Sequence, residues 1–142
     1  MGLELRSDKE FRDAMDLVFQ LMDDDDEMGP RLRDADVPQR FEFDDIDMVL
    51  NVRATRDGEP GNLHWEWTDD VDWEPKVRMK MSAETAVRYF QGKENIPIAI
   101  ARRRIKTGGD VKAALALIPI TKPVYAMFRE ALEERYPHLV VS

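Results

Sequence analysis

Apolar side chains near the start of the chain repeat in steps of three and four residues, the spacing of one helical face. Ser7 followed by Glu10 matches a capping box and places the start of this helix. Five consecutive acids, Asp23 to Glu27, are unfavourable at a helix C-terminus and predict its end. The run lacks the spaced oxygens and central glycine of a calcium loop, so we expect a solvated acidic turn. The apolar face comprises Phe11, Ala14, Met15, Val18, Phe19 and Met22.

Further along the chain apolar and polar residues alternate, which is typical of strands with one buried face. We expect strands to begin near Phe41 and to continue in Asp47–Thr55, Leu63–Thr68 and Val77–Met81. The short connections predict that the last three pair as an antiparallel meander. Asn51 and Arg53 fall on the polar side of their strand. The side expected to face the helices comprises Met48, Leu50, Val52, Leu63, Trp65, Trp67, Val77, Met79 and Met81.

The segment from Ser82 to Asp110 alternates short helices with one strand. Ser82 and Asn95 are typical N-cap residues, and Gly92 suits the left-handed position that ends a helix. Residues 103–107 predict a strand, and Gly108-Gly109-Asp110 predicts a turn that leads into a helix capped by the aspartate.

Two further helices complete the chain. The first is expected to bury Val111, Ala114, Leu115 and Ile118. The second starts at Thr121-Lys122-Pro123 and is ended by Pro137. Its buried side is predicted to comprise Val124, Met127, Phe128, Ala131 and Leu132. The element order predicts an α+β fold, with a mixed, mostly antiparallel sheet of about five strands covered on one face by helices.

Part of this pattern resembles the sterol carrier protein 2 (SCP2-like) lipid-transfer family. A helix ending in Gly-Lys precedes Asn and an Ala-containing helix, and a basic strand then ends in Gly-Asp. The resemblance is clear over Val77–Ile118. The chain departs from the family pattern at Arg103, where glycine is frequent, and at the extra Gly108. The matching positions are Gly92, Lys93, Asn95, Ala99, Arg104, Ile105, Lys106, Gly109 and Asp110.

The resemblance implies one SCP2-like domain over residues 1–142, with a hydrophobic tunnel between the sheet and the C-terminal helices. The N-terminal helix and acidic connector would occupy residues 1–40, and the sheet and tunnel helices residues 41–142. On spacing alone, apolar residues of a packed core and of a tunnel wall are not distinguished. The predicted tunnel wall comprises Met79, Met81, Val87, Phe90, Ile96, Ile100, Leu115, Ile118, Val124, Met127 and Phe128.

Charge is divided unevenly along the chain. Residues 1–75 carry 23 acidic and 8 basic side chains, whereas residues 76–142 carry 6 acidic and 13 basic ones. Two solvated surfaces that attract each other explain this division, and so does contact of the basic half with an anionic partner. Nucleic acid is disfavoured by the overall pI of about 4.8. The residues predicted to contact a lipid head group or an anionic membrane are Arg102, Arg103, Arg104 and Lys106.

Candidate catalytic residues are scarce. The chain has no cysteine, which excludes disulfides, thiolate metal sites and a cysteine nucleophile, and fits a reducing compartment. Neither His64 nor His138 lies at a recognisable triad spacing, so both are expected at the surface. Gly108-Gly109 lacks the lysine and hydroxyl residue of a phosphate loop. We therefore expect no enzymatic activity, no cofactor and no metal.

These features predict a non-catalytic lipid-binding and lipid-transfer protein that holds a fatty acyl, acyl-CoA, sterol-like or phospholipid ligand. The alternative is an accessory subunit that presents a lipid to a partner enzyme, with the acidic half as its docking face. The first ten residues lack the apolar segment of a signal peptide, and no apolar run approaches the ~20 residues of a membrane span. We expect a cytoplasmic protein.

Overall fold

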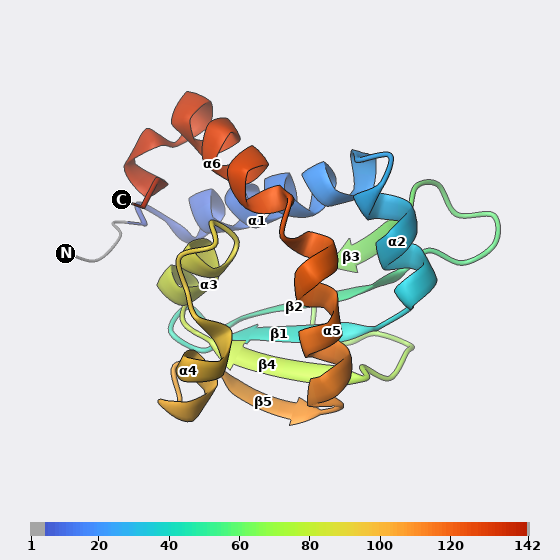
Figure 1. The fold of residues 1–142 in the computed structure, drawn as a ribbon. Helices are drawn as coiled ribbons and strands as arrows, with labels where there is room; N and C mark the ends of the chain where they lie inside the picture. The colour runs from blue at the N-terminus through green and yellow to red at the C-terminus, as the bar shows by residue number, and fades with distance from the viewer. Residues whose placement is uncertain (1–4, 142) are drawn as a thin grey trace.

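The computed structural model describes residues 5–141, and its helices gather on one side of a five-stranded sheet (Figure 1). Residues 1–4, on which part of the signal-peptide argument rests, lie outside the described range. The strands are β1 (Gln39–Phe43), β2 (Met48–Ala54), β3 (Leu63–Glu66), β4 (Val77–Met81) and β5 (Lys106–Gly109). The helices are α1 (Asp8–Asp24), α2 (Met28–Ala35), α3 (Ala83–Tyr89), α4 (Ile96–Ala101), α5 (Val111–Thr121), α6 (Val124–Arg135) and the 3-10 turn Pro137–Leu139.

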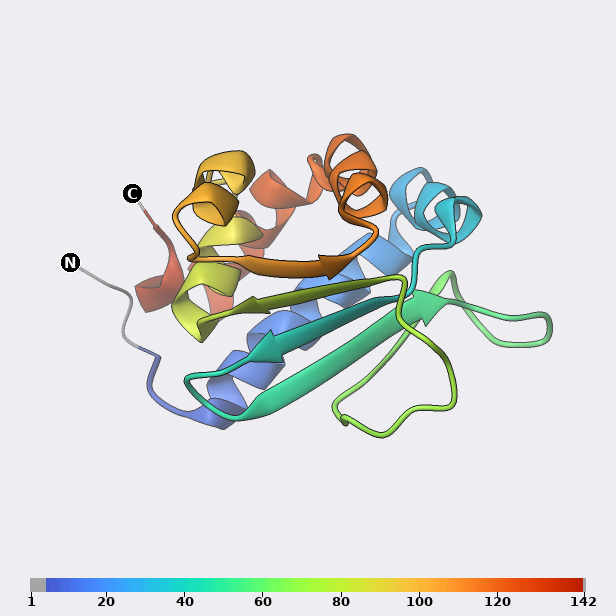
Figure 2. The same cartoon turned by 90° about the horizontal axis from the view of Figure 1, so that it is seen from below.

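The strand order is β3-β2-β1-β4-β5, and all neighbours are antiparallel except β1 and β4. Figure 2 shows α1 running behind the sheet and the opposite face bare of helices. The predicted α+β class and the mixed, mostly antiparallel sheet are therefore confirmed.

The predicted meander is wrong in one pairing. β3 pairs with β2, but β4 pairs in parallel with β1, with Phe41 opposite Met79. The connector after β3, residues 67–76, carries the chain past β2 and β1 before it enters β4. A connection of this length permits a crossover as well as a hairpin, so loop length alone did not determine the partner.

The connector between β3 and β4 also contacts the face of the sheet that lies away from the helices. Leu50 and Val52 are buried toward the helices, so the predicted register is correct. Asn51 and Arg53, expected on a half-exposed polar face, are also buried. The Asn51 amide donates to the Thr68 carbonyl at 2.6 Å, and the Arg53 guanidinium lies 4.8 Å from the ring centre of Trp73.

The acidic run is structural as well as solvated. α1 starts at the Ser7 cap, whose hydroxyl accepts from the Glu10 N–H, and the six predicted face residues are all buried. The Asp23 carboxylate accepts from the N–H groups of Asn62 and Leu63, at 2.6 and 2.7 Å. The Asp25 carboxylate accepts from the N–H of Met28, the first residue of α2, at 2.8 Å. The expectation of a merely solvated turn is therefore wrong for these two acids.

The strand predicted at residues 103–107 is displaced, since β5 covers Lys106–Gly109. Arg103 has a φ of 61°, a left-handed conformation that ends the turn after α4 and that glycine adopts most easily. Gly108 and Gly109, predicted as a turn, pair with Arg78 and Val77 of β4. A Cβ on Gly109 would clash with the Lys76 carbonyl oxygen, so this pairing requires glycine.

The predicted buried face of α5 is correct at Ala114 and wrong at Leu115. Ala114, Leu117 and Thr121 are buried, whereas Leu115 is 38% exposed. Nearly all of α5 is apolar, so periodicity gives little contrast between its faces. For α6, Val124, Phe128 and Leu132 are buried as predicted, and Met127 and Ala131 are partly buried.

Candidate functional site

A small cavity of about 30 Å³ lies between the helices and the sheet. Its wall combines residues from α1, α2, β1, β2, β3, α3 and α5, so elements from both halves of the chain enclose it. The lining residues are Phe19, Met22, Leu32, Val37, Gln39, Phe41, Val52, Arg53, Ala54, Leu63, Tyr89, Phe90, Leu117 and Thr121.

Three phenylalanines form one wall of this cavity. The ring centres of Phe19 and Phe90 lie 5.6 Å apart, and Phe41 lies 6.1 and 6.4 Å from them. Such edge-to-face and tilted contacts stabilise aromatic clusters beyond the burial of their area. They give the cavity a firm apolar side built on α1, β1 and the end of α3.

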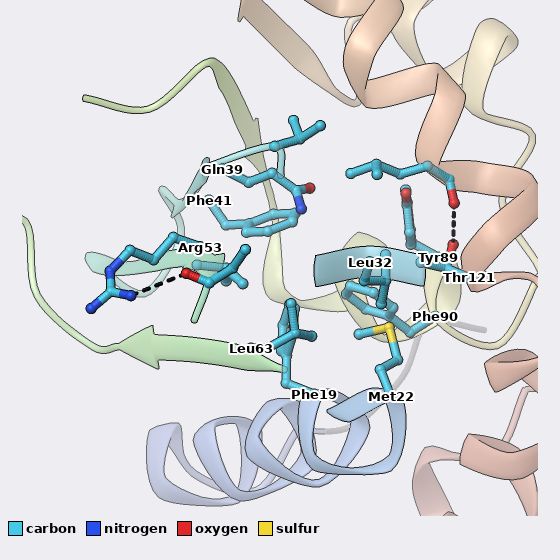
Figure 3. Close-up of a pocket in the computed structure, with 14 residues that line it drawn as sticks. Phe19, Met22, Leu32, Gln39, Phe41, Arg53, Leu63, Tyr89, Phe90 and Thr121 are labelled. Carbon is cyan, nitrogen blue, oxygen red and sulfur yellow. Dashed lines mark hydrogen bonds between the residues drawn. The ribbon is translucent and has the colours of Figure 1, made fainter. Parts of the chain in front are cut away.

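Another part of the cavity wall is polar but carries no accessible charge. In Figure 3 the polar ends of Gln39 and Tyr89 lie on one side of the cavity, and Phe19, Met22 and Leu63 lie on the other. The Thr121 hydroxyl donates to the Leu117 carbonyl at 3.2 Å and also has a hydrogen bond with the Tyr125 side chain, which leaves one lone pair of the oxygen. Burial raises the pKa of the Tyr89 hydroxyl well above its ordinary value, so this group stays neutral.

Arg53 reaches the cavity wall, but its guanidinium points away from it (Figure 3). The guanidinium donates to both carboxylate oxygens of Glu59, at 2.6 and 2.9 Å. It also donates to the Ala54 carbonyl at 3.1 Å and stacks on Trp73. Its charge is therefore paired outside the cavity, and its buried Nε–H has no hydrogen-bond partner among the described residues.

The cavity is too small for a lipid as it stands. Sites for small ligands usually measure about 300–1,000 Å³, and this one has room for about one water molecule. Binding of an acyl chain therefore requires at least one wall to move. Among the helices that line the cavity, α5 has the fewest buried residues for its length, since three of its eleven residues are buried.

The structure brings one predicted tunnel residue, Phe90, to the cavity. The others do not line it: Leu115 is exposed, and Ile100, Ile118 and Met127 are partly buried against the core. Their contact with a ligand stays a prediction. The remaining residues are packed in the core or at its edge, namely Met79, Met81, Val87, Ile96, Val124 and Phe128.

Sequence reasoning missed most of the actual wall. Phe19 and Met22 were predicted to be buried on the N-terminal helix, but the family resemblance pointed to the C-terminal half. Leu32 and Val37 lie in a stretch with no strong periodicity. Gln39 is a polar residue at the start of a strand, and no sequence signal distinguishes it from a surface glutamine.

The four predicted head-group residues are all exposed and lie at the α4–β5 junction, away from the cavity wall. Arg104 is held by Glu94 at 2.5 Å, and Arg88 approaches the same carboxylate at 3.6 Å. Arg102, Arg103 and Lys106 make no ion pair within residues 5–141.

Each histidine lies beside a carboxylate. His64 Nε2 is 3.2 Å from Glu66 on the same strand, and His138 Nε2 is 2.5 Å from Glu10. The second contact joins the C-terminal turn to the start of α1, so the expected surface position is wrong for His138, whose side chain is 20% exposed. Among residues 5–141, no group of three or more His, Cys, Asp or Glu residues is placed to hold a metal ion.

Comparison with known proteins identifies the fold. No family model and no curated protein sequence matches the chain. Solved SCP2 structures do match: the apo form of sterol carrier protein 2 from Yarrowia lipolytica has a TM-score of 0.57 and 13% identity, with 88% of this chain and 98% of that one covered. A protein described as UbiJ-SCP2, a ubiquinone synthesis protein, gives 0.58 and 8%, with coverage of 80% and 94%.

An enzyme also contains a matching part. The inverting sec-alkylsulfatase Pisa1 from Pseudomonas sp. has a TM-score of 0.59 and 19% identity, over 75% of this chain but 16% of that one. The present chain therefore spans about a sixth of the sulfatase. The chain has the SCP2-like fold, as its sequence pattern predicted.

Proposed function

We propose that this protein binds and transfers lipids, holding one apolar ligand between α5 and the sheet. The observation that carries the proposal is the cavity, which has an aromatic wall and lies inside an SCP2-like fold. Each CH₂ group that leaves water for such a site contributes roughly 0.8 kcal/mol. An acyl or isoprenoid chain is therefore the ligand class whose apolar character matches the aromatic wall, once a wall of the cavity has moved outward.

Ligand entry would proceed by outward movement of α5 relative to α2. Leu32 and Leu117 lie on these two helices, and both line the cavity and are nearly buried. Elements with few buried residues open at lower free energy than core elements do. α5 has a proline within it, Pro119, and it meets α6 at a bend of 66°. No single helix in residues 5–141 is long and apolar enough to cross a bilayer, although α5 and α6 pass that test as a bent pair.

The surface on which the lipid would be exchanged lies around α4, β5 and α5, which share one side of the molecule (Figures 1 and 2). Ile98 and Leu115 are the two large exposed apolar side chains of the described chain. Residues 97–127 carry six cations and one acid, Asp110, within a protein of net charge −8. Charge of this sign attracts anionic phospholipid, and apolar side chains enter the interface.

Transfer of a fluorescent lipid between donor and acceptor vesicles tests the proposal. We expect the purified protein to accelerate transfer without any partner, faster from vesicles of phosphatidylglycerol and phosphatidylcholine than from phosphatidylcholine alone, and less so as salt rises. A triple variant with Arg102→Gln, Arg103→Gln and Lys106→Gln should lose the preference for anionic vesicles. The matched control replaces Lys9, Arg31 and Arg33 by glutamine on the acidic half.

The second candidate is an accessory subunit that presents a lipid to an enzyme. It is favoured by the occurrence of similar folds in a sulfatase and in a ubiquinone synthesis protein. Lipid binding without transfer between vesicles would support this role over the carrier. In either role we propose no catalytic step, because the two histidine–carboxylate pairs lie away from the cavity wall.

A further inference from the structure

The cavity has a polar end whose chemistry is specific. Tyr89 is 9% exposed and comes from α3, and its hydroxyl has no hydrogen-bond partner within residues 5–141. The hydroxyl oxygen is not among the fully buried polar atoms of the described chain that lack a partner, so it is reachable at the cavity wall, where a ligand or water can pair with it. Gln39, on β1, is likewise without a side-chain partner in the described chain.

These two groups line the cavity together with Thr121, whose hydroxyl is drawn with its hydrogen bond in Figure 3. Together they offer a phenol that donates or accepts, an amide that does both, and a hydroxyl oxygen that accepts. A ligand hydroxyl can use both its donor and its acceptor here, and a carbonyl can accept from Tyr89 or from Gln39. The set is complementary to an uncharged polar group.

A carboxylate fits the same place poorly. Among the fourteen lining residues, Arg53 is the one with a charged side chain, and its guanidinium is held by Glu59 and Trp73 outside the cavity. Burying an ionised group without a paired charge is far more costly than burying a hydroxyl. The exposed cations at residues 102–106 do not line the cavity.

We propose that this cavity selects lipids whose polar group is an uncharged hydroxyl or carbonyl over lipids that end in a carboxylate. The selectivity resides in Tyr89 and Gln39, with Thr121 as an additional acceptor. The inference rests on the proposed lipid binding and goes further by naming the head-group chemistry and the residues that recognise it.

Competition between two lipids that have the same alkyl chain but different polar groups tests this selectivity. Diphenylhexatriene, an uncharged probe that fluoresces in apolar surroundings, is loaded into the full-length protein and displaced by dodecanol or by dodecanoate. The measurement is made at about pH 8, where a carboxylic acid is ionised. We expect dodecanol to displace the probe at about tenfold lower concentration, because the carboxylate must shed its water without gaining a cation.

Tyr89→Phe assigns the effect to a residue. The substitution keeps the ring and removes a hydroxyl that makes no hydrogen bond within the described protein, so the fold is retained. We expect dodecanol binding to weaken by about fivefold, the value of one neutral hydrogen bond, and dodecanoate binding to stay unchanged. Tyr136→Phe, a tyrosine between α1 and α6 that does not line the cavity, is the control and should change neither.

The outcomes distinguish failure of the proposed head-group selectivity from failure of the proposed lipid binding. If diphenylhexatriene binds but dodecanoate displaces it as well as dodecanol does, or if Tyr89→Phe leaves dodecanol binding intact, the selectivity is wrong and lipid binding stands. If neither lipid nor the probe binds the wild-type protein, the proposed function itself is overturned.

Discussion

The carboxylate of Asp23, in the last turn of α1, accepts a hydrogen bond of 2.7 Å from the backbone N–H of Leu63, the first residue of β3. The same carboxylate accepts from Asn62, and the Asp23 carbonyl accepts from the Asn62 amide. β3 is an edge strand, so this contact fixes its start against the helix that covers the sheet.

Loss of this contact should destabilise the protein. Asp23→Ala leaves two partly buried N–H groups unpaired, and we expect a loss of about 1–3 kcal/mol in the free energy of unfolding. Asp26→Ala, an exposed acid of the same run, should stay within about 0.5 kcal/mol of wild type. Urea unfolding of both variants measures the difference, and equal stabilities would mean that the acidic run is only a solvated turn.

A substitution at Arg103 should stabilise the protein instead of destabilising it. Its φ of 61° is strained for a residue with a Cβ, by roughly 1–2 kcal/mol, and glycine relieves this strain at a smaller entropic cost. We expect Arg103→Gly to raise the free energy of unfolding by about 0.5–1 kcal/mol. The neighbouring Arg102 has a φ of −92°, so Arg102→Gly should lower it instead. A melting temperature that falls in both variants would show that the turn gains nothing from glycine.

Glu59 should make part of the stability dependent on acid. The hydrogen bonds from Arg53, and then from the Arg56 N–H, lower the pKa of Glu59 from 4.5 to about 2. A carboxyl group whose pKa is lower in the folded state than in the unfolded state stabilises the folded protein. Its full contribution is present above the unfolded pKa and is lost as the pH falls from about 4.5 towards 2.

Glu59→Gln should therefore flatten the loss of stability over this pH range relative to wild type. Glu74→Gln, an exposed glutamate of the β3–β4 connector, is the matched control and should leave the acid profile unchanged. Thermal unfolding in buffers between these pH values is the measurement. Parallel profiles for wild type and Glu59→Gln would contradict the ion pair seen with Arg53.

The sequence was sufficient to predict the buried positions of elements in which one face is apolar and the other polar. The apolar stripe of α1 and the alternation of Val77–Met81 coincide with buried positions because polar residues separate the apolar ones. In α5 both Leu115 and Leu117 are apolar and two residues apart, so the pattern could not tell which one faces the cavity. The Arg103 turn was visible only as a departure from the glycine of the family pattern.

Pairing and cavity depend on distant contacts that no local pattern contains. Trp73 covers Arg53 from a connector twenty residues further along the chain. The parallel contact of β1 with β4 joins segments separated by two strands. Phe90 lines the cavity and Phe128 packs in the core, although both read as apolar helix positions. Residue type does not distinguish a wall from a core when both are apolar.

Mass spectrometry of lipid extracted from purified wild-type, Leu117→Trp and Leu115→Trp proteins tests the cavity most directly. The two substitutions are identical and lie on the same helix, but Leu117 lines the cavity and Leu115 is exposed. Circular dichroism first checks that both variants are folded, since overpacking costs typically about 1–3 kcal/mol. We predict that lipid accompanies the wild type and Leu115→Trp in comparable amounts and is lost from folded Leu117→Trp. Equal amounts of lipid in all three proteins, or none in the wild type, would contradict the account.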